Sequence, residues 1–205
     1  MTTTVVDHPL AATLLTALRD RTTPPSLFRL LTKRLALALT LEATRTAPTS
    51  PCTVETPLGR AAGRMLDGVP VAVPILRAGL GMLEAVTELL PDVAVGYIGL
   101  ERDHATFRPA AYYSKLPPLA GAWVLLLDPM LATGGSASAA CDALAAERAG
   151  RITLLSVVAA PEGIGRLAER HPAVEVVTAA IDRGLDEHAY IVPGLGDFGD
   201  RLFGT

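Results

Sequence analysis

The chain has 205 residues, half of them hydrophobic, and a formal net charge of −3. This length and composition suit one domain with a sizeable apolar core, and an acidic balance without a block of Lys or Arg disfavours general nucleic-acid binding. The two cysteines lack CxxC spacing, and neither of the two lysines stands in a GK pair. These facts disfavour a zinc site, a redox pair and a P-loop nucleotidase.

Membrane and targeting signals are missing from the sequence pattern. No window approaches about 18 uninterrupted apolar residues, and the N-terminus has no basic region followed by a long apolar stretch. Cys52 and Cys141 stand far apart, and free thiols fit a reducing compartment. We therefore expect a cytoplasmic protein with no membrane partner.

The expected elements change character along the chain. Leucines at helical spacing, in two runs separated by Pro24 and Pro25, predict that the first 50 residues are helical. A Thr-, Pro- and Gly-rich stretch over 46–63 predicts an irregular arm or a hairpin. Short apolar runs typical of buried strands then alternate with helical stretches. The expected strands are 69–76, 93–100, 123–128, 151–160 and 174–181, and the expected helices are 79–90, 136–149 and 163–170.

Strands that are apolar throughout and alternate with helices indicate an α/β fold with a mostly parallel, twisted sheet flanked by helices. We predict a single domain over 1–205. It consists of N-terminal helices and an arm (1–68), an α/β core (69–182) and a C-terminal extension (183–205). Ligands of such sheets bind beyond the carboxyl ends of the strands. The motifs LRAG, ERD and DPMLATGGS each follow an expected strand there.

The segment DPMLATGGS, residues 128–136, follows a buried strand and leads into an alanine-rich helix. Glycines let the backbone approach a ligand closely, and the free N–H groups at a helix N-terminus attract anions. Thr133 and Ser136 add hydroxyl donors, so the loop suits a dianionic phosphate without a lysine. A phosphate would repel Asp128, whereas sugar hydroxyls or positive charge developing on a sugar would suit it. Both features together predict a ribose 5-phosphate, although TGGS alone also fits a plain helix connection capped by Asp128.

Four long segments together resemble the uracil phosphoribosyltransferase family. They are VPILRAGLGM (73–82), DPMLATGGS (128–136), VVAAPEGI (157–164) and IDRGLDEHAYIVPGLGDFGDRLFGT (181–205). The last is the most specific, because it separates this family from other phosphoribosyltransferases. The resemblance implies a type I phosphoribosyltransferase fold. It also implies transfer of the phosphoribosyl group of 5-phosphoribosyl 1-diphosphate (PRPP) to uracil, giving UMP and pyrophosphate in pyrimidine salvage, with Mg²⁺ on the pyrophosphate.

The resemblance also assigns the PRPP contacts. Asp128, Arg102 and Asp197 are expected to be catalytic. Arginine stays charged and offers phosphate oxygens a fork of donors, although Arg102 by itself would be read as a surface ion pair. The segment at Arg77 is expected to be strained, with a non-proline cis peptide. The full expected PRPP set is Arg77, Ala78, Gly79, Arg102, Asp128, Pro129, Met130, Leu131, Ala132, Thr133, Gly134, Gly135, Ser136 and Asp197.

The C-terminal segment IVPGLGDF resembles the family's uracil-binding loop. Backbone N–H and C=O groups can match the acceptor–donor–acceptor edge of uracil, which explains a segment rich in Gly and Pro. The resemblance places base contacts at Ile191, Gly196, Asp197 and Phe198, with Mg²⁺ near Asp197 but no direct protein ligand. Phe198 replaces a smaller residue common in the family, so a ring turned inward would change the size of the pocket.

Further expectations concern partners and alternatives. The family suggests a homodimer or a higher homo-oligomer formed through the N-terminal helices and the arm, and in some members GTP is an effector. Residues 103–116 are expected to form a flexible hairpin that covers the site and excludes water. Two alternatives stay open: a phosphoribosyltransferase for another base, and an RNA-binding regulator of pyrimidine genes. The regulator would need a broad basic face, which the acidic composition disfavours.

Overall fold

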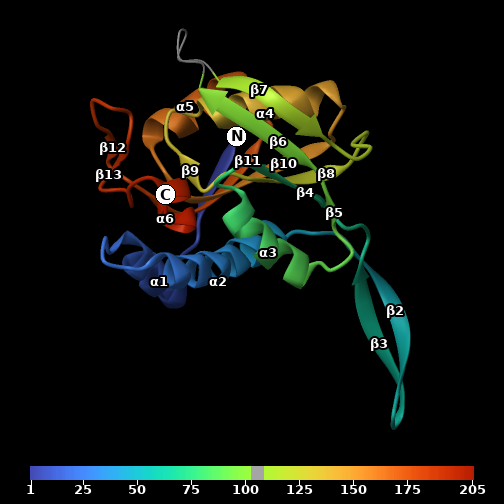
Figure 1. The fold of residues 1–205 in the computed structure, drawn as a ribbon. Coiled ribbons are helices and arrows are strands. Elements are labelled where there is room, and N and C mark those ends of the chain that lie inside the picture. Colours follow the sequence, from blue (N-terminus) through green and yellow to red (C-terminus); the bar gives the residue numbers. More distant parts are fainter. Residues whose placement is uncertain (103–108) are drawn as a thin grey trace.

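A twisted sheet forms the centre of the fold in the computed structural model, which describes residues 1–102 and 109–205 (Figure 1). Its strand order is β1-β11-β10-β8-β4-β6-β7, with short β5 and β9 beside β4 and β10. The pairings between described strands of this sheet are parallel except that of β6 with β7. The strands are β1 (Thr2–Val5), β4 (Val71–Leu76), β5 (Ala94–Val95), β6 (Tyr97–Arg102), β7 (Pro109–Lys115), β8 (Trp123–Leu127), β9 (Met130–Leu131), β10 (Arg151–Ala159) and β11 (Glu175–Ile181).

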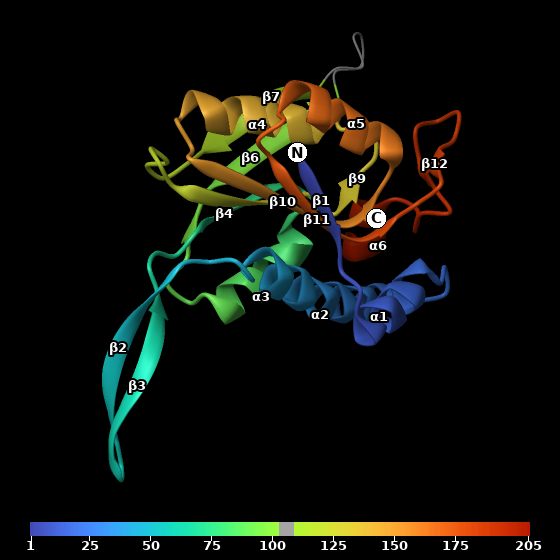
Figure 2. The ribbon, with the colours of Figure 1, turned by 180° about the vertical axis from the view of Figure 1, so that it is seen from behind.

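Helices cover both faces of this sheet. Figures 1 and 2 show α1, α2 and α3 on one face and α4 and α5 on the other. Their bounds are α1 (Pro9–Arg19), α2 (Pro25–Ala43), α3 (Leu80–Leu89), α4 (Gly135–Ala146) and α5 (Pro161–Arg170). This arrangement confirms the predicted α/β class, a mostly parallel sheet flanked by helices. No helix in the described part of the chain has the length and apolar character needed to span a bilayer.

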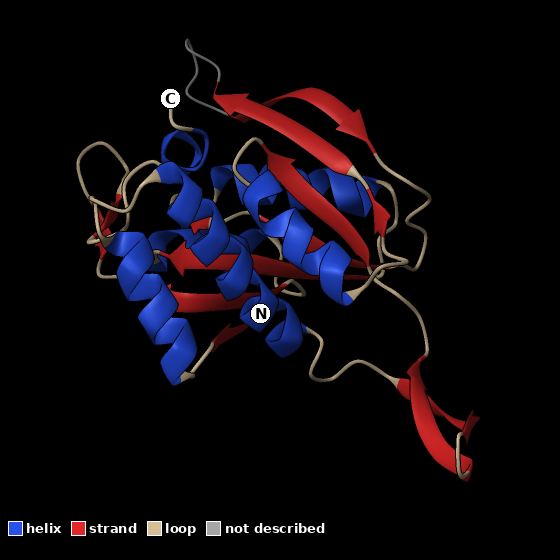
Figure 3. Cartoon of the chain, turned by 60° about the horizontal axis from the view of Figure 1, so that its bottom comes forward, coloured by secondary structure: helices blue, strands red, loops and turns tan. Residues whose placement is uncertain are grey.

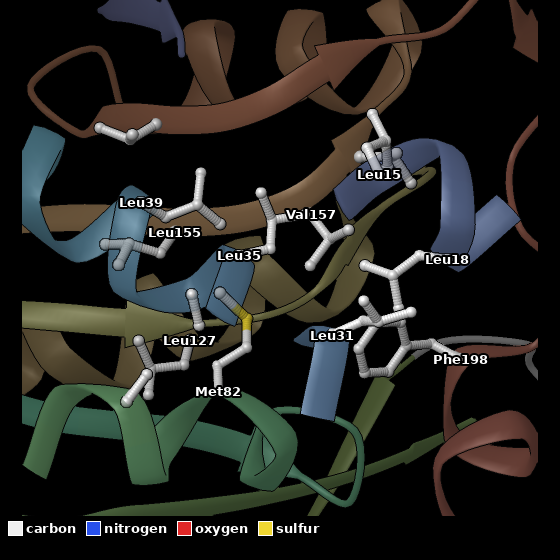
Figure 4. Packing of buried hydrophobic residues seen from close by; sticks show 14 of the residues in the cluster. Leu15, Leu18, Leu31, Leu35, Leu39, Met82, Leu127, Leu155, Val157 and Phe198 are labelled. Carbon is white, nitrogen blue, oxygen red and sulfur yellow. The ribbon is translucent and has the colours of Figure 1, made fainter. Parts of the chain in front are cut away.

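The core lies in two layers because successive strand residues point to opposite faces. Leu127 belongs to the layer under α1–α3, whereas Leu126 belongs to the layer under α4 and α5. In the first layer, Leu39 of α2 packs beside Leu155 of β10 (Figure 4). Both side chains are fully buried. Since each central strand is apolar on both faces, its sequence has no alternation, as expected for a buried parallel sheet.

The N-terminus differs from the sequence expectation. Residues Thr2–Val5 form the edge strand β1, paired in parallel with residues 175–178 of β11, so the prediction that the first 50 residues are helical was wrong at this end. Threonine and valine are β-branched and fit a strand. The helical leucine pattern begins only at Leu10, within α1.

The arm over 46–63 is a β-hairpin, one of the two forms predicted for it. Strands β2 (Thr49–Thr56) and β3 (Gly59–Leu66) pair antiparallel and extend away from the body (Figure 3). Leu58 at the tip is 100% exposed. A two-stranded ribbon is only marginally stable alone, so its connection to the body holds it in place.

The C-terminal extension folds back over the sheet edge. It contains the short pair β12 (Gly184–Leu185) and β13 (Ile191–Val192), followed by α6 (Phe198–Phe203). Figure 1 shows this segment beside β9, near the carboxyl ends of the central strands. Residues far apart in sequence therefore meet at that edge.

The α2–sheet layer should dominate stability. Leu39→Ala should lower the free energy of unfolding by about 2–5 kcal/mol, because it removes a fully buried side chain and leaves a cavity. Urea unfolding followed by circular dichroism measures the change. Glu169→Ala, at an exposed position of α5, is the control and should shift it by less than about 0.5 kcal/mol. Equal effects of the two variants would contradict this assignment of the core.

Candidate active site

The parallel strands bring three charged residues to one edge of the sheet. Arg77, Asp128 and Asp182 each directly follow a strand, namely β4, β8 and β11. Because β4 and β11 both connect through β8 and β10 in parallel register, these residues emerge at the same end. This is the edge at which open α/β sheets bind ligands.

The loop after β8 is fastened along β10. Asp128 N–H donates to Leu155 O (3.1 Å), and Pro129 O accepts from Val157 N–H (2.9 Å). Leu131 donates its N–H to Ser156 Oγ (3.1 Å) and is itself fully buried. These bonds occupy the inner part of the loop. Of the remaining residues, Ala132 and Thr133 are half-buried and Ser136 is exposed.

The turn into α4 depends on two glycines in close contact. Gly134 has φ +71°, and a Cβ there would lie 2.8 Å from Gly163 O. A Cβ on Gly163, in the first turn of α5, would lie 2.5 Å from Ala132 O. The loop and the α5 N-terminus therefore pack backbone to backbone. Thr133 is half-buried and Ser136 is exposed at the start of α4, where unpaired N–H groups and the helix dipole favour an anion.

Asp128 lies half-buried at the end of β8. Burial raises the pKa of its carboxyl from the ordinary value of 3.8 to about 7, while a hydrogen bond from the Met130 backbone acts in the opposite direction. No Lys or Arg side chain among those described forms an ion pair with it. A desolvated, unpaired carboxyl group of this kind interacts strongly with hydroxyls or with positive charge near it.

The segment after β4 approaches the same place. A Cβ on Gly79 would lie 2.4 Å from Leu127 O, so only glycine lets this turn pack against the end of β8. The peptide bond between Leu76 and Arg77 is cis, which confirms the non-proline cis peptide expected in the segment at Arg77. The Arg77 side chain is exposed, and its guanidinium carbon lies 5.6 Å from the centre of the Phe203 ring in α6. Arg77 thus lies between the β4 edge and the C-terminal helix.

A cavity of about 320 Å³ joins the loop to the C-terminal extension. Met130 and Ala132 of the loop form one wall. The opposite wall contains all four residues expected to contact a base. The complete lining is Met130, Ala132, His188, Ala189, Tyr190, Ile191, Gly196, Asp197 and Phe198. The two segments singled out by the sequence are therefore walls of a single cavity.

Comparison with known proteins decides the family. The family model described as uracil phosphoribosyltransferase matches residues 5–205. The chain belongs to the uracil phosphoribosyltransferase family. It is 50% identical to the uracil phosphoribosyltransferase of Symbiobacterium thermophilum over 203 residues, covering 98% of this chain and 97% of that one. It is also 50% identical to that of Thermus thermophilus over 207 residues and the full length of both chains.

Solved structures show the same fold. A protein from Aquifex aeolicus superposes with a TM-score of 0.94 at 35% identity, covering 100% of this chain and 99% of that one. An adenine phosphoribosyltransferase from Trypanosoma brucei superposes with a TM-score of 0.60 at 13% identity, covering 95% and 87% of the two chains, which shows the shared fold alone. The resemblance of the four sequence segments is thereby confirmed.

Phe198, the family departure noted in the sequence, has its ring in the core. The side chain is 2% exposed and meets the Phe28 ring edge-on, with centroids 5.1 Å apart. Figure 4 shows Phe198 beside Leu31 and Leu18 of the N-terminal helices. The ring thus anchors the start of α6 while the residue still borders the cavity. Its contribution to a base contact would come through its backbone.

The remaining expected residues have varied positions. Asp197 is exposed at the cavity and caps α6, its Oδ1 accepting from Asp200 N–H (2.9 Å). Arg102 ends β6, and its side chain is outside the described part, as are residues 103–108 of the expected covering hairpin. Within residues 1–102 and 109–205, no three His, Cys, Asp or Glu side chains gather as a metal site.

Three cavity residues were not singled out from sequence. His188, Ala189 and Tyr190 line the cavity beside the base segment. Asp186 orders the turn that holds them, since its Oδ1 accepts from the N–H groups of His188 (2.9 Å) and Tyr190 (2.8 Å). Their position directly before Ile191 was the available signal. The resemblance to the uracil-binding loop was assigned to IVPGLGDF, which begins only after this turn.

The raised pKa of Asp128 should make the folded state less stable as pH rises, the opposite of the usual effect of a carboxyl group. Its folded pKa of about 7 exceeds the unfolded value near 3.8, so between these values the folded state binds the proton more tightly. The free energy of unfolding should therefore fall as pH rises through this window, by at most about 4 kcal/mol. In Asp128→Asn this part of the pH dependence of the free energy of unfolding should be absent. Urea unfolding of both proteins at pH 5 and pH 8 measures it, and identical pH dependence in the two would contradict the raised pKa.

Proposed function

We propose that this chain transfers the 5-phosphoribosyl group of PRPP to uracil, giving UMP and pyrophosphate in pyrimidine salvage. The observation that carries this proposal is the shared cavity. Met130 and Ala132 of the phosphate loop and Ile191 and Gly196 of the base segment line the same space. A ribose 5-phosphate on one wall and a planar base on the other would meet at the bond that forms. The activity of the relatives at 50% identity supports the same reaction.

The phosphoribosyl part would be held by the loop after β8. The 5-phosphate would lie at the N-terminus of α4, contacted by backbone N–H groups from Gly134 to Ser136 and by the Thr133 hydroxyl. Asp128 would face the ribose. Breaking the C1–pyrophosphate bond leaves a sugar with oxocarbenium character, and a carboxylate without its own cation is suited to stabilise that charge. Pro129 takes the place where many phosphoribosyltransferases have a second acid, so Asp128 carries the ribose side from this strand.

The diphosphate part would be bound from the neighbouring strands. Arg77 is exposed at the end of β4, and its turn packs Gly79 against Leu127, the residue before Asp128. Arg102, at the end of β6, adds a second cation in this proposal. Arginine retains its charge near phosphates and can donate two parallel hydrogen bonds. Departure of pyrophosphate would then be assisted by these two side chains.

Uracil would be recognised by the backbone of the C-terminal segment. Gly196 has φ +80° and is exposed to the cavity, and the next residue Asp197 is exposed as well. Ile191 and Phe198 are buried on either side, which fixes the segment. Backbone N–H and C=O groups at 196–198 could pair with the alternating edge of uracil. A base bound closely against this segment would exclude water from the cavity. PRPP would then be protected from hydrolysis.

Mg²⁺ is part of the proposal as a companion of the diphosphate. It favours oxygen ligands and usually keeps several waters while bridging one or two carboxylates and phosphate oxygens. Asp197 would lie near such an ion, because its carboxylate is exposed at the cavity and its Oδ1 accepts a hydrogen bond from Asp200 N–H. When bound, the ion would neutralise charge on the leaving pyrophosphate. The residues of this chain position the sugar and the base.

A homodimer is proposed from the exposed apolar surface. Leu10 and Leu41 are 67% and 61% exposed along a groove of about 600 Å³ between α1 and α2, and Leu58 and Met65 are exposed on the hairpin. Burial of such a surface against a second copy would be favourable. We also propose that GTP affects the activity, as in some members of the family. A cytoplasmic location is proposed as well, and it suits the free thiols.

The direct test is formation of UMP from uracil and PRPP with Mg²⁺, followed by chromatography. A panel with cytosine, adenine, hypoxanthine and orotate defines the base. Uracil should be the preferred acceptor and pyrophosphate the co-product. Reaction of hypoxanthine or orotate without reaction of uracil would overturn the assignment of the base. Omission of Mg²⁺ should greatly reduce the rate, and addition of GTP tests for an effector.

Asp128 should matter for turnover far more than for folding. Asp128→Asn should lower kcat by about 10²–10³-fold, as expected when one preorganised electrostatic group is lost, with the circular dichroism spectrum unchanged. Steady-state kinetics at saturating uracil and PRPP measure it. Asp142→Asn is a matched control, since Asp142 is an exposed carboxylate of α4 paired with Arg170. Near-normal turnover of Asp128→Asn would remove Asp128 from the mechanism.

A further inference from the structure

The backbone of Gly194 lies between the expected base contacts Ile191 and Gly196. A closed ring of charged hydrogen bonds holds it. Arg19 at the end of α1 donates from Nη1 to Gly194 O (2.8 Å) and from Nη1 and Nη2 to the two carboxylate oxygens of Asp182 (2.8 and 2.6 Å). Asp182 Oδ2 in turn accepts from Gly194 N–H (2.9 Å). Both polar groups of one peptide residue are thus fixed by an ion pair.

The turn at Gly194 is also fixed by close backbone packing. Gly194 has φ +56°, and a Cβ there would lie 2.1 Å from Ile191 O, so the turn cannot accept a side chain. Gly194 follows the base residue Ile191 by three positions and precedes Gly196 by two. A shift of this turn would therefore move the base contacts on both sides of it.

A second arginine holds the neighbouring residue. Arg201 of α6 donates to Leu195 O (2.8 Å) and Asp20 O (2.6 Å), and also to Leu18 O. Its guanidinium carbon lies 4.4 Å from the centre of the Phe28 ring, which itself contacts Phe198. The C-terminal segment is in this way tied to the end of α1 and the start of α2.

The burial of the ion pair argues for a task beyond stability. The Asp182 side chain is 5% exposed and that of Arg19 25% exposed. Withdrawing two charges from water is costly, and apolar replacements of similar volume are often as stable. A charged pair has a different use here: its fork geometry fixes the orientation of a peptide group, which an apolar contact cannot do.

We propose that Arg19 and Asp182 are positioning residues for the pyrimidine base, acting through Gly194 on the contacts at Ile191 and Gly196–Phe198. This inference rests on the proposed function and adds two residues that lie outside the cavity. It assigns α1, an element remote in sequence from the sheet edge, a role in base affinity. The phosphate loop has no bond to this ring among the described residues, so binding of the phosphoribosyl part should be independent of it.

The kinetic test separates the two substrates. Arg19→Ala should raise KM for uracil by about tenfold, since displacement of recognition groups by a fraction of an ångström to 1 Å has effects on this order or larger, while KM for PRPP stays within about twofold. Arg19→Lys should recover part of the loss, because it can pair with Asp182 but cannot bond Gly194 O in the same geometry. Asp182→Asn tests the acceptor side. A parallel rise of both KM values, or no rise, would overturn the proposal.

Two controls distinguish positioning from general destabilisation. Arg170→Ala breaks an exposed arginine–carboxylate pair between α4 and α5 and should change neither KM. Leu39→Ala lowers stability in the α2 layer without touching the ring, and its KM for uracil should stay near that of the unmodified protein. If Leu39→Ala raises KM for uracil as much as Arg19→Ala does, the effect is one of stability and the proposal fails.

A binding measurement works without turnover. Calorimetric titration with UMP and with ribose 5-phosphate should show weaker UMP binding in Arg19→Ala, by about tenfold, and unchanged ribose 5-phosphate binding. Equal weakening of the two ligands would contradict the proposal. Failure of the unmodified protein to make UMP at all would refute the proposed function instead, and a normal enzyme whose variants bind UMP normally would refute this inference alone.

Discussion

Parallel pairing of β8 with β10 and β4 is the constraint on which the site depends. It brings the ends of these strands to one edge, so Arg77 and Asp128 emerge together although they are far apart in sequence. The loop after β8 then follows β10 through bonds such as that from Val157 N–H to Pro129 O. The sheet therefore occupies peptide groups of the inner loop, and the proposed phosphate contacts fall on the outer turn, where α4 begins.

Close backbone contacts turn this edge into a narrow site. Gly79 meets the end of β8, and Gly134 meets Gly163 at the start of α5, both at distances where a side chain would not fit. The same compactness withdraws Asp128 from water and raises its pKa to about 7. The electrostatic character of the site thus follows from packing, because desolvation is the main cause of the raised pKa of this carboxyl group.

The C-terminal wall of the cavity, which is proposed to bind the base, is held in place in a different way. The C-terminal segment has little regular structure of its own, and it is held by side chains of α1, α2 and α6 and by Asp182, which follows β11. Arg19 and Asp182 fix Gly194, Arg201 bonds Leu195 O, and Phe198 packs on Phe28. These contacts from outside the segment would hold its peptide groups in place for the proposed base contacts.

The sequence by itself determined the α/β class and the family, because these depend on local patterns such as apolar strands, glycines before a helix and the motif IVPGLGDF. It did not reveal strand β1, whose four residues are too short for a periodic signal. Nor did it reveal that His188 to Tyr190 line the cavity, or that Arg19 reaches Asp182 across 163 positions. Only the tertiary structure decided these points, because a contact between distant residues leaves no periodic or local signal in a single sequence.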